Sequence, residues 1–345
     1  MSFRVRLTGD FLDTDGTPRY PDIGTDLLDD AGLAWSIMDE HRSELAPDQI
    51  GGATGVIVLT PAVTAASLSS SDDLLAIGRF GVGYDAVDIA ACTEHDVVVF
   101  ITPGAVDRPV AEATVTWILA LGHKVIQKDR LVREGRWDDR SGFMGQEVRD
   151  RTVGLVGCGR IGRAVIGLLA GFGMKSPVVF DPYLSESDAK AIGVRKVDLP
   201  ELLGEADYVS VHCPLTDETR GLIGADELAA MKPGAYLINT ARGGIVDEDA
   251  LEAALKNGPI AGAALDCFAE EPVASPSRFA GCENVVLAPH SIAWTRELFR
   301  DIGRMACGGM VDLAEGREPA GVVNREVFGK RSFRDKWERL RGDHR

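Results

Sequence analysis

The sequence lacks an excess of positive charge. It carries 37 Lys and Arg residues against 53 Asp and Glu residues, which gives a formal net charge of −16 at pH 7. Nucleic acids and acidic membranes repel a strongly anionic partner. The charge balance therefore argues against a general affinity for either of them. It does not exclude a small anionic substrate, which needs only a local cluster of arginines.

Long apolar runs and paired cysteines are also missing. No run approaches the roughly 20 apolar residues of a membrane span, and residues 1–6 are too polar to begin a secretory signal. The six cysteines are scattered and form no CxxC pair. Such spacing is typical of reduced thiols and not of a disulfide framework or a zinc site. We therefore expect a cytoplasmic protein that has neither a membrane segment nor a metal site.

Short apolar runs alternate with helical patterns along most of the 345 residues. This alternation predicts parallel sheets that are covered by helices on both faces, and the length favours two domains. The fold class expected is α/β, with two doubly wound parallel-sheet domains. Strands are expected at residues 4–7, 56–59, 74–78, 97–100, 152–156, 178–180, 208–212, 235–239, 260–265 and 285–288.

The second domain is expected over residues 105–295 and opens with a long helix that starts near Pro109 and runs past Lys124. Residues 1–104 form the first domain. Too few elements follow residue 295 for a third domain, so residues 296–345 are expected to return and complete the first. Residues 330–345 are mostly charged, with apolar residues at helical spacing, and predict a docked surface helix, with a frayed end as the alternative. The loop at residues 11–24 could cover or reshape a pocket.

A glycine-rich turn, GCGRIG, follows the apolar strand at residues 152–156 and leads into a helical pattern. Gly157 permits the tight turn, Gly159 lets the backbone approach a pyrophosphate, and Gly162 lets the helix pack close to the strand. The pyrophosphate would lie on the free N–H groups at the start of that helix. Asp181 ends the next strand, 19 residues after Gly162, where a carboxylate would bind an adenosine ribose.

The residues around Asp181 also bear on the choice of cofactor. Its carboxylate would repel a 2′-phosphate, and the next three residues, Pro182-Tyr183-Leu184, supply no arginine to bind one. The sequence therefore favours NAD over NADP.

A bound nicotinamide dinucleotide implies hydride transfer. Hydride transfer to a carbonyl needs a cation that holds and polarises the substrate and an acid that delivers a proton. Three loops follow predicted strands at one sheet edge and carry such groups: Arg242, the pair Glu270 and Glu271, and His290. Taken singly, these residues have ordinary explanations as a solvated arginine, a charged surface turn and a structural histidine. Their shared edge beside the glycine-rich turn favours a functional set.

Several strings of this sequence resemble those of the D-isomer-specific 2-hydroxyacid dehydrogenases, a family that includes phosphoglycerate, glyoxylate/hydroxypyruvate and D-lactate dehydrogenases. The resemblance spans roughly residues 55–325. It implies a homodimer of two-domain subunits, each with a flavodoxin-like substrate domain and a Rossmann NAD-binding domain. The strings are VGLVGCGRIGRA, NTARGGIVDEDALEAAL, LDCFAEEP, APH and the upstream GRFGVGYDAVDIAACTEHDVVVFITPG.

The resemblance also assigns roles to residues. It implies that Arg242 binds the substrate carboxylate and carbonyl, that His290 is the general acid/base, and that Glu271 hydrogen-bonds the imidazole. A carboxylate behind a histidine stabilises its protonated form. The amides of Val82 and Gly83 would meet the substrate carboxylate. Cofactor contacts are expected from Gly157, Gly159, Arg160, Ile161, Gly162, Asp181, Cys213, Pro214, Thr219, Thr240, Ala241 and Asp266. Arg79, Tyr84, Arg108, Trp117 and Trp294 are further candidates for the pocket, although packing or surface roles explain such residues equally well.

Three departures from the family pattern bear on which branch of the family the sequence resembles. The first fifty residues fit the family poorly. The segment that follows His290 lacks the glycine pair that often stands there, which counts against the phosphoglycerate branch. Position 271 is Glu and not the Gln of the formate branch.

The leading hypothesis is an NAD-dependent enzyme that transfers hydride between nicotinamide and C2 of a small 2-oxo or 2-hydroxy acid of D configuration, such as a hydroxypyruvate reductase. Two alternatives stay open. One is a non-catalytic, NAD-sensing protein like the family's corepressors, which resemble the enzymes even at the Arg, Glu and His positions. The other is a dehydrogenase of a phosphite-type anion, which Arg242 would hold equally well.

Overall fold

The computed structural model describes residues 3–69 and 72–341, and the chain divides into two compact units. The first comprises Met1–Val106 together with Trp294–Arg345, and the second comprises Asp107–Ala293. One unit holds a five-stranded sheet and the other a seven-stranded sheet, and every strand pair in both is parallel. The predicted fold class is confirmed.

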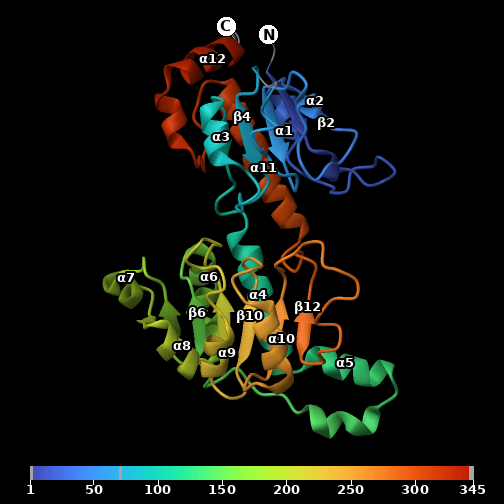
Figure 1. Ribbon diagram of the computed structural model, residues 1–345, viewed down its shortest axis with the longest axis vertical. Coiled ribbons are helices and arrows are strands. Elements are labelled where there is room, and N and C mark those ends of the chain that lie inside the picture. Colours follow the sequence, from blue (N-terminus) through green and yellow to red (C-terminus); the bar gives the residue numbers. More distant parts are fainter. Residues whose placement is uncertain (1–2, 70–71, 342–345) are drawn as a thin grey trace. The chain divides into compact units, whose positions relative to one another are not determined.

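The first unit is built on a sheet with the strand order β2-β1-β3-β4-β5 (Figure 1). Its strands are β1 (Arg4–Leu7), β2 (Ala34–Ile37), β3 (Gly55–Val58), β4 (Ala76–Arg79) and β5 (Val98–Phe100). Its helices are α1 (Asp26–Asp30), α2 (Pro47–Ile50), α3 (Ile89–Glu94), α11 (Arg296–Ala314) and α12 (Arg331–Arg341), with short 3-10 turns η1 (Gly9–Phe11) and η4 (Arg325–Gly329).

The C-terminal segment packs on the first unit. Helix α11 begins at Thr295, whose hydroxyl accepts a hydrogen bond from the Leu298 amide at 3.0 Å. A Cβ at Gly78 of β4 would lie 2.7 Å from the Phe100 ring and 3.0 Å from Met310 of α11, so the glycine lets the helix approach the sheet. The docked helix expected over residues 330–345 is present as α12, which buries Phe333. Residues 342–345 of that prediction lie outside the described residues.

The second unit is built on a sheet with the strand order β12-β11-β10-β9-β6-β7-β8 (Figure 1). Its strands are β6 (Val153–Val156), β7 (Val178–Phe180), β8 (Arg195–Lys196), β9 (Tyr208–Val211), β10 (Tyr236–Asn239), β11 (Gly262–Leu265) and β12 (Val285–Leu287). Its helices are α4 (Asp107–Gly122), α5 (Val125–Arg133), α6 (Arg160–Leu169), α7 (Glu186–Ala191), α8 (Leu199–Glu205), α9 (Ala225–Ala230) and α10 (Glu248–Asn257), with 3-10 turns η2 (Trp137–Phe143) and η3 (Ala170–Phe172).

Both faces of the seven-stranded sheet are buried, because successive side chains of a strand point to opposite faces. In β10, Leu237 joins the core under α8, α9 and α10. Its neighbours Tyr236 and Ile238 join the core under α4 and α6. Each large apolar side chain buried in this way contributes about 1.5–3 kcal/mol relative to exposure. These two cores fix the strands, so the loops at their carboxyl ends start from a rigid edge.

Some elements differ from the sequence prediction. The helix expected to run past Lys124 ends at Gly122, and α5 begins after Lys124, whose φ of 52° is left-handed. A Cβ at Gly122 would lie 2.6 Å from the Tyr208 hydroxyl, so this turn of α4 packs closely on the sheet. The edge strands β2 and β8 and the short helices α2 and α7 were not predicted. The two edge strands are short and largely solvent-accessible, so their apolar signal is weak. Among the described residues, no helix is long and apolar enough to cross a membrane.

Candidate active site

The glycine-rich turn between β6 and α6 has the geometry of a phosphate cradle. Gly157 has a φ of 94°, and a Cβ there would lie 2.8 Å from the Cys213 amide nitrogen. A Cβ at Gly162 would lie 2.8 Å from the Gly157 carbonyl oxygen, whereas nothing lies within 4 Å of a Cβ at Gly159. Gly159 is the N-cap residue of α6 and brings no side chain to cap its free N–H groups. The open backbone at the positive end of this helix therefore fits a pyrophosphate.

Asp181 is tied to the glycine-rich turn. One carboxylate oxygen accepts a hydrogen bond from the Cys158 amide at 2.8 Å, and the other accepts one from the Tyr183 amide at 2.8 Å. A carboxylate has about four acceptor positions, so two hydrogen bonds leave capacity for ribose hydroxyls. The residue is thus placed both to shape the turn and to bind a ribose.

Arg160 and Ile161 begin helix α6. The Arg160 guanidinium is paired with Asp107, the first residue of α4, at 2.6 Å between Nε and Oδ2. Its side chain is 70% exposed, so it can exchange this partner for a phosphate at little cost. Ile161 packs against the hydrophobic core that α4 and α6 cover, and this contact supports the glycine-rich turn.

The loops after β9 and β10 are fastened by threonine hydroxyls. Thr219 donates a hydrogen bond to the Pro214 carbonyl at 2.6 Å and accepts one from the Thr216 amide at 2.7 Å, which fixes the loop that begins at Cys213. The hydroxyls of Thr240 and Thr114 lie 3.2 Å apart and join the turn after β10 to α4. Thr219 and Thr240 therefore shape the loops in which they lie.

The turn that carries Arg242 is held by a buried side chain that the sequence reasoning missed. Asn239, 1% exposed, accepts a hydrogen bond from the Ala241 amide at 3.0 Å and donates one to the Arg242 carbonyl at 2.8 Å. The Arg242 guanidinium donates to the Ala241 carbonyl at 2.7 Å. A side chain at Gly243 would overlap the Phe268 carbonyl, so glycine lets this turn press against the loop after β11.

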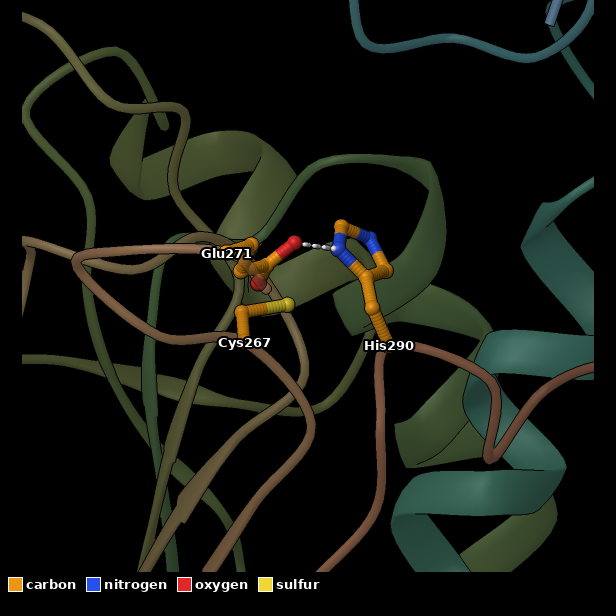
Figure 2. Close-up of side chains that lie close together, drawn as sticks. All are labelled: Cys267, Glu271 and His290. Atoms are coloured by element: carbon orange, nitrogen blue, oxygen red, sulfur yellow. Dashed lines mark hydrogen bonds and ion pairs between the residues drawn. The ribbon is translucent and has the colours of Figure 1, made fainter. Parts of the chain in front are cut away.

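That loop carries Glu271, which contacts His290 from the loop after β12. Glu271 Oε2 lies 2.8 Å from Nδ1 of His290, and Oε1 accepts a hydrogen bond from the Phe268 amide at 2.9 Å (Figure 2). Burial alone would raise the pKa of Glu271, but these two hydrogen bonds and the positive charge of Arg242 outweigh it and lower the pKa. The carboxylate is therefore ionised and oriented at neutral pH.

The pKa of His290 shifts in the opposite direction. Hydrogen bonds with Cys267 and Glu271 raise it to about 10 against the opposing effect of burial. The backbone of His290 is left-handed, with a φ of 53°. Asp266 holds the loop there, since its Oδ1 accepts hydrogen bonds from the amides of Ser291 at 2.8 Å and Ile292 at 3.1 Å. Asp266 therefore positions the loop that carries His290.

Cys267 is the second residue that the sequence reasoning missed. Figure 2 shows its side chain turned toward Glu271 and His290, and one ligand atom from each of the three lies within 4.8 Å of the others. Its place directly after Asp266, in a loop already expected to carry chemistry, was the signal available. His212, which follows β9, forms a hydrogen bond with the Ser210 hydroxyl at 2.9 Å, and burial lowers the pKa of its imidazole to about 4, so it stays neutral and structural.

In the first unit, the turn after β4 carries Val82 and Gly83. Gly81 has a φ of 136°, and its carbonyl accepts a hydrogen bond from the Thr102 amide at 3.0 Å. Within the described part of the chain, no acceptor is found for the amides of Val82 and Gly83. These two donors are therefore available to a carboxylate.

An aromatic cluster surrounds the start of this turn and includes the loop at residues 11–24. The Phe80 ring packs on Phe11 at 4.9 Å between centroids and lies 5.9 Å from Phe299. Tyr20 stacks on Phe299 at 3.9 Å, and Trp294 meets the same ring edge-on at 5.1 Å. We refer to Phe11, Tyr20, Phe80, Trp294 and Phe299 as the aromatic cluster. Of the other pocket candidates, Trp117 is buried in the core of the second unit, and Arg108 is paired with Glu112 on the surface of α4.

Comparison with known proteins places the chain in a family. Residues 115–291 match the profile of the D-isomer specific 2-hydroxyacid dehydrogenase, NAD binding domain. The chain belongs to this family and is an NAD-dependent oxidoreductase of 2-hydroxy acids. The predicted family, enzyme class and NAD cofactor are thereby confirmed.

Several relatives show how far the similarity extends. The chain is 38% identical to the glyoxylate reductase of Korarchaeum cryptofilum over 275 residues, which cover 79% of this chain and 82% of that protein. It is 40% identical to the D-3-phosphoglycerate dehydrogenase of Archaeoglobus fulgidus, but over only 49% of that longer protein and 76% of this chain. The solved D-lactate dehydrogenase of Escherichia coli has a TM-score of 0.78 at 25% identity, covering 93% of this chain and all of that one.

Proposed function

We propose that the protein reduces a small 2-oxo acid to the corresponding D-2-hydroxy acid with NADH, and catalyses the reverse oxidation. The observation that carries this proposal is the contact of 2.8 Å between His290 and Glu271, beside the turn of Arg242. A general acid, its orienting carboxylate and a substrate-binding cation are the three groups that carbonyl reduction requires.

The second unit is proposed as the NAD-binding domain. Bound NAD supplies or accepts the hydride at C2 of the substrate. The backbone around Gly159 would hold the pyrophosphate, and Asp181 would accept hydrogen bonds from the ribose and repel a 2′-phosphate. The remaining proposed contacts are Gly157, Arg160, Ile161, Gly162, Cys213, Pro214, Thr219, Thr240, Ala241 and Asp266. Of these, Thr219 and Asp266 already serve loop structure, so their contribution to cofactor binding is expected to be partly indirect.

His290 would deliver the proton in the reductive direction. Its raised pKa keeps the imidazole protonated near neutral pH, and Glu271 stabilises that cation. Arg242 would hold the substrate carboxylate and carbonyl, and its charge opposes the negative charge that develops on the oxygen. In the oxidative direction, the neutral imidazole accepts the hydroxyl proton.

The first unit is proposed as the substrate-binding domain, with the amides of Val82 and Gly83 binding the carboxylate. Glyoxylate and hydroxypyruvate are the first substrates to test, since the name of the Korarchaeum relative is glyoxylate reductase. We further propose that the protein is a homodimer. We also propose that it is located in the cytoplasm, in keeping with six cysteines that are all free thiols.

The test is a panel of 2-oxo acids assayed with NADH and with NADPH, followed by optical detection and chiral analysis of the product. We expect turnover of at least one small 2-oxo acid, preference for NADH and a D product. NADH binding without turnover of any 2-oxo acid would favour the NAD-sensing alternative. Turnover of phosphite in preference to every 2-oxo acid would favour the anion dehydrogenase.

A further inference from the structure

Cys267, Glu271 and His290 form a cluster that carbonyl reduction does not require in full. The reaction uses the imidazole and its carboxylate, whereas the thiol exchanges no proton or hydride with the substrate and contributes only a hydrogen bond to the imidazole. Yet the thiol sulfur, a Glu271 oxygen and a His290 ring nitrogen all lie within 4.8 Å of one another (Figure 2). Thiolate, imidazole and carboxylate are the three side-chain ligand types of zinc sites in proteins.

We propose that these three side chains bind a thiophilic divalent cation such as Zn²⁺, and that the bound ion inhibits proton transfer by His290. This goes beyond the proposed function, because it assigns an inhibitory metal site to side chains that the proposed function uses for proton transfer.

The present geometry is close to that of a tetrahedral site. Zinc bonds of about 2.3 Å to sulfur and 2.0–2.2 Å to nitrogen and oxygen place pairs of ligand atoms roughly 3.3–3.7 Å apart. The distance between Glu271 Oε2 and His290 Nδ1 is now 2.8 Å and has to lengthen by about half an ångström. The ligand atoms of Glu271 and His290 lie at most 4.8 Å from the Cys267 sulfur, so neither distance has to shorten by more than about 1.5 Å. Side-chain rotations supply movements of this size.

The surroundings hold two of the ligands in place while leaving the site open. The second Glu271 oxygen is held by the Phe268 amide, and the loop of His290 is held by Asp266. Such neighbouring hydrogen bonds orient metal ligands. The side chains of His290 and Glu271 are 47% and 35% exposed, so an ion can enter and keep a water as its fourth ligand.

Binding would block the acid/base cycle for a chemical reason. The metal displaces the proton on Nδ1 of His290 and takes the lone pair there, while Cys267 changes from thiol to thiolate, and both protons pass to solvent. With Nδ1 occupied, the ring can exchange a proton only by becoming an imidazolate, which is costly near neutral pH. Glu271, now a metal ligand, no longer stabilises an imidazolium. Reduction should therefore stop while the metal stays bound.

Direct binding tests the site without any assay of turnover. The full chain, free of metal, would be titrated with Co²⁺ and followed by the thiolate-to-cobalt charge-transfer absorption, and with Zn²⁺ by calorimetry. We expect one ion per chain, and at least a tenfold weaker affinity with loss of the absorption in Cys267→Ala. Cys282→Ala, which changes a half-buried thiol outside the cluster, should behave as the wild type. An unchanged absorption or affinity in Cys267→Ala would overturn the proposal.

Inhibition is measured next, with each variant compared with its own rate in the absence of metal. Micromolar Zn²⁺ should inhibit NADH-dependent reduction by the wild type, a chelator should restore it, and Cys267→Ala should need at least tenfold more Zn²⁺. Cys267→Ser, which keeps the side-chain volume, and circular dichroism of both variants show that the fold is intact. Stoichiometric Zn²⁺ binding without inhibition would overturn the inhibitory role. If no 2-oxo acid is turned over, the proposed function fails, while the cobalt titration still decides the metal site.

Discussion

The carboxyl edges of the two parallel sheets have the same architecture and contrasting contents. In the second unit, the strand-end loops carry ionisable side chains that backbone amides hold in place: Asp181, Asp266 and Glu271 each accept at least one such hydrogen bond. In the first unit, one such carboxylate, Asp10, accepts a hydrogen bond from the Thr60 amide. The turn after β4 offers the amides of Val82 and Gly83, and the aromatic cluster gathers from the loops after β1 and β4 and from the start of α11. The edge of the second unit therefore carries more charges at fixed positions, and the first unit carries mainly aromatic surface.

This contrast teaches where substitutions should act on rate and where they should act on selectivity. Charged groups fixed in advance stabilise a developing charge without reorganisation, so their loss lowers the rate of reaction. Aromatic surfaces contribute contact area, so their loss changes the discrimination among substrates by smaller factors. The predictions below test this division, from the largest expected effect to the smallest.

Arg242→Ala should have the largest effect. Removing the cation that holds and polarises the substrate is expected to lower kcat/KM by at least about 10²–10³-fold, the range seen when one electrostatic donor is lost. NADH binding, measured by fluorescence titration, should stay within a factor of two or so of the wild type. Arg242→Lys serves as the matched control and should recover only part of the activity, since an ammonium cannot bind a carboxylate through two parallel donors. Retention of most activity in the alanine variant would remove Arg242 as substrate anchor.

Glu271→Gln should change the pH dependence. Hydrogen bonds with Cys267 and Glu271 raise the pKa of His290 to about 10, and reduction requires the protonated ring. The wild-type rate of reduction should therefore persist through neutral pH and fall as the pH rises through the raised pKa. In Glu271→Gln, the carboxylate charge is lost, the pKa of His290 falls, and the decline should begin at lower pH. Glu270→Gln, the neighbouring substitution, should leave the profile unchanged, and an unshifted profile in Glu271→Gln would show that this carboxylate does not tune the imidazole.

Two substitutions of Asp181 can separate its proposed role in cofactor choice from its role as acceptor for the Cys158 amide. Asp181→Ala should reduce the preference for NADH over NADPH by about tenfold, the size of one lost charge interaction near a phosphate. It should also weaken NADH binding, because the Cys158 amide loses its acceptor. Asp181→Asn keeps an acceptor for that amide without the charge, so it should change the cofactor ratio while disturbing NADH binding less. Equal kcat/KM ratios for the two cofactors in all three proteins would contradict the proposed ribose contact.

Much of this architecture follows from local signals in the sequence, as the caps show. An aspartate just before a helical segment is a strong N-cap signal, and the carboxylates of Asp88 and Asp198 accept hydrogen bonds from the amides of Ala91 and Glu201 at the starts of α3 and α8. The glycine-rich turn could be predicted as well, because its glycine spacing follows a strand and leads into a helix. The Arg, Glu and His loops could be placed on one edge because the carboxyl ends of parallel strands share it.

Other features of the site depend on contacts between distant segments and left no local signal. Asn239 is different, because its side chain contacts Ala241 and Arg242, only two and three residues on, and an asparagine at a strand end was the local signal available. Gly243 is needed because a loop 25 residues later passes over it. The spacing of the cysteines argued against a metal site, and only folding brings His290 to Cys267 and Glu271, which lie four residues apart in one loop. Pairwise proximity across loops is a property of the tertiary structure, which periodicity and spacing do not encode.

The smallest effect is expected in the aromatic cluster. Trp294 is 50% exposed and meets Phe299 edge-on, so Trp294→Ala should cost little stability while removing contact surface from the aromatic cluster. We expect kcat/KM for glyoxylate to change by less than about threefold, and that for a 2-oxo acid with a large apolar side chain to fall by about tenfold, as a hydrophobic contact of 1–3 kcal/mol would give. The ratio of the two values is the measurement. A parallel loss of kcat for both substrates would mean that this edge also controls the rate, and the division between charge and shape would not hold.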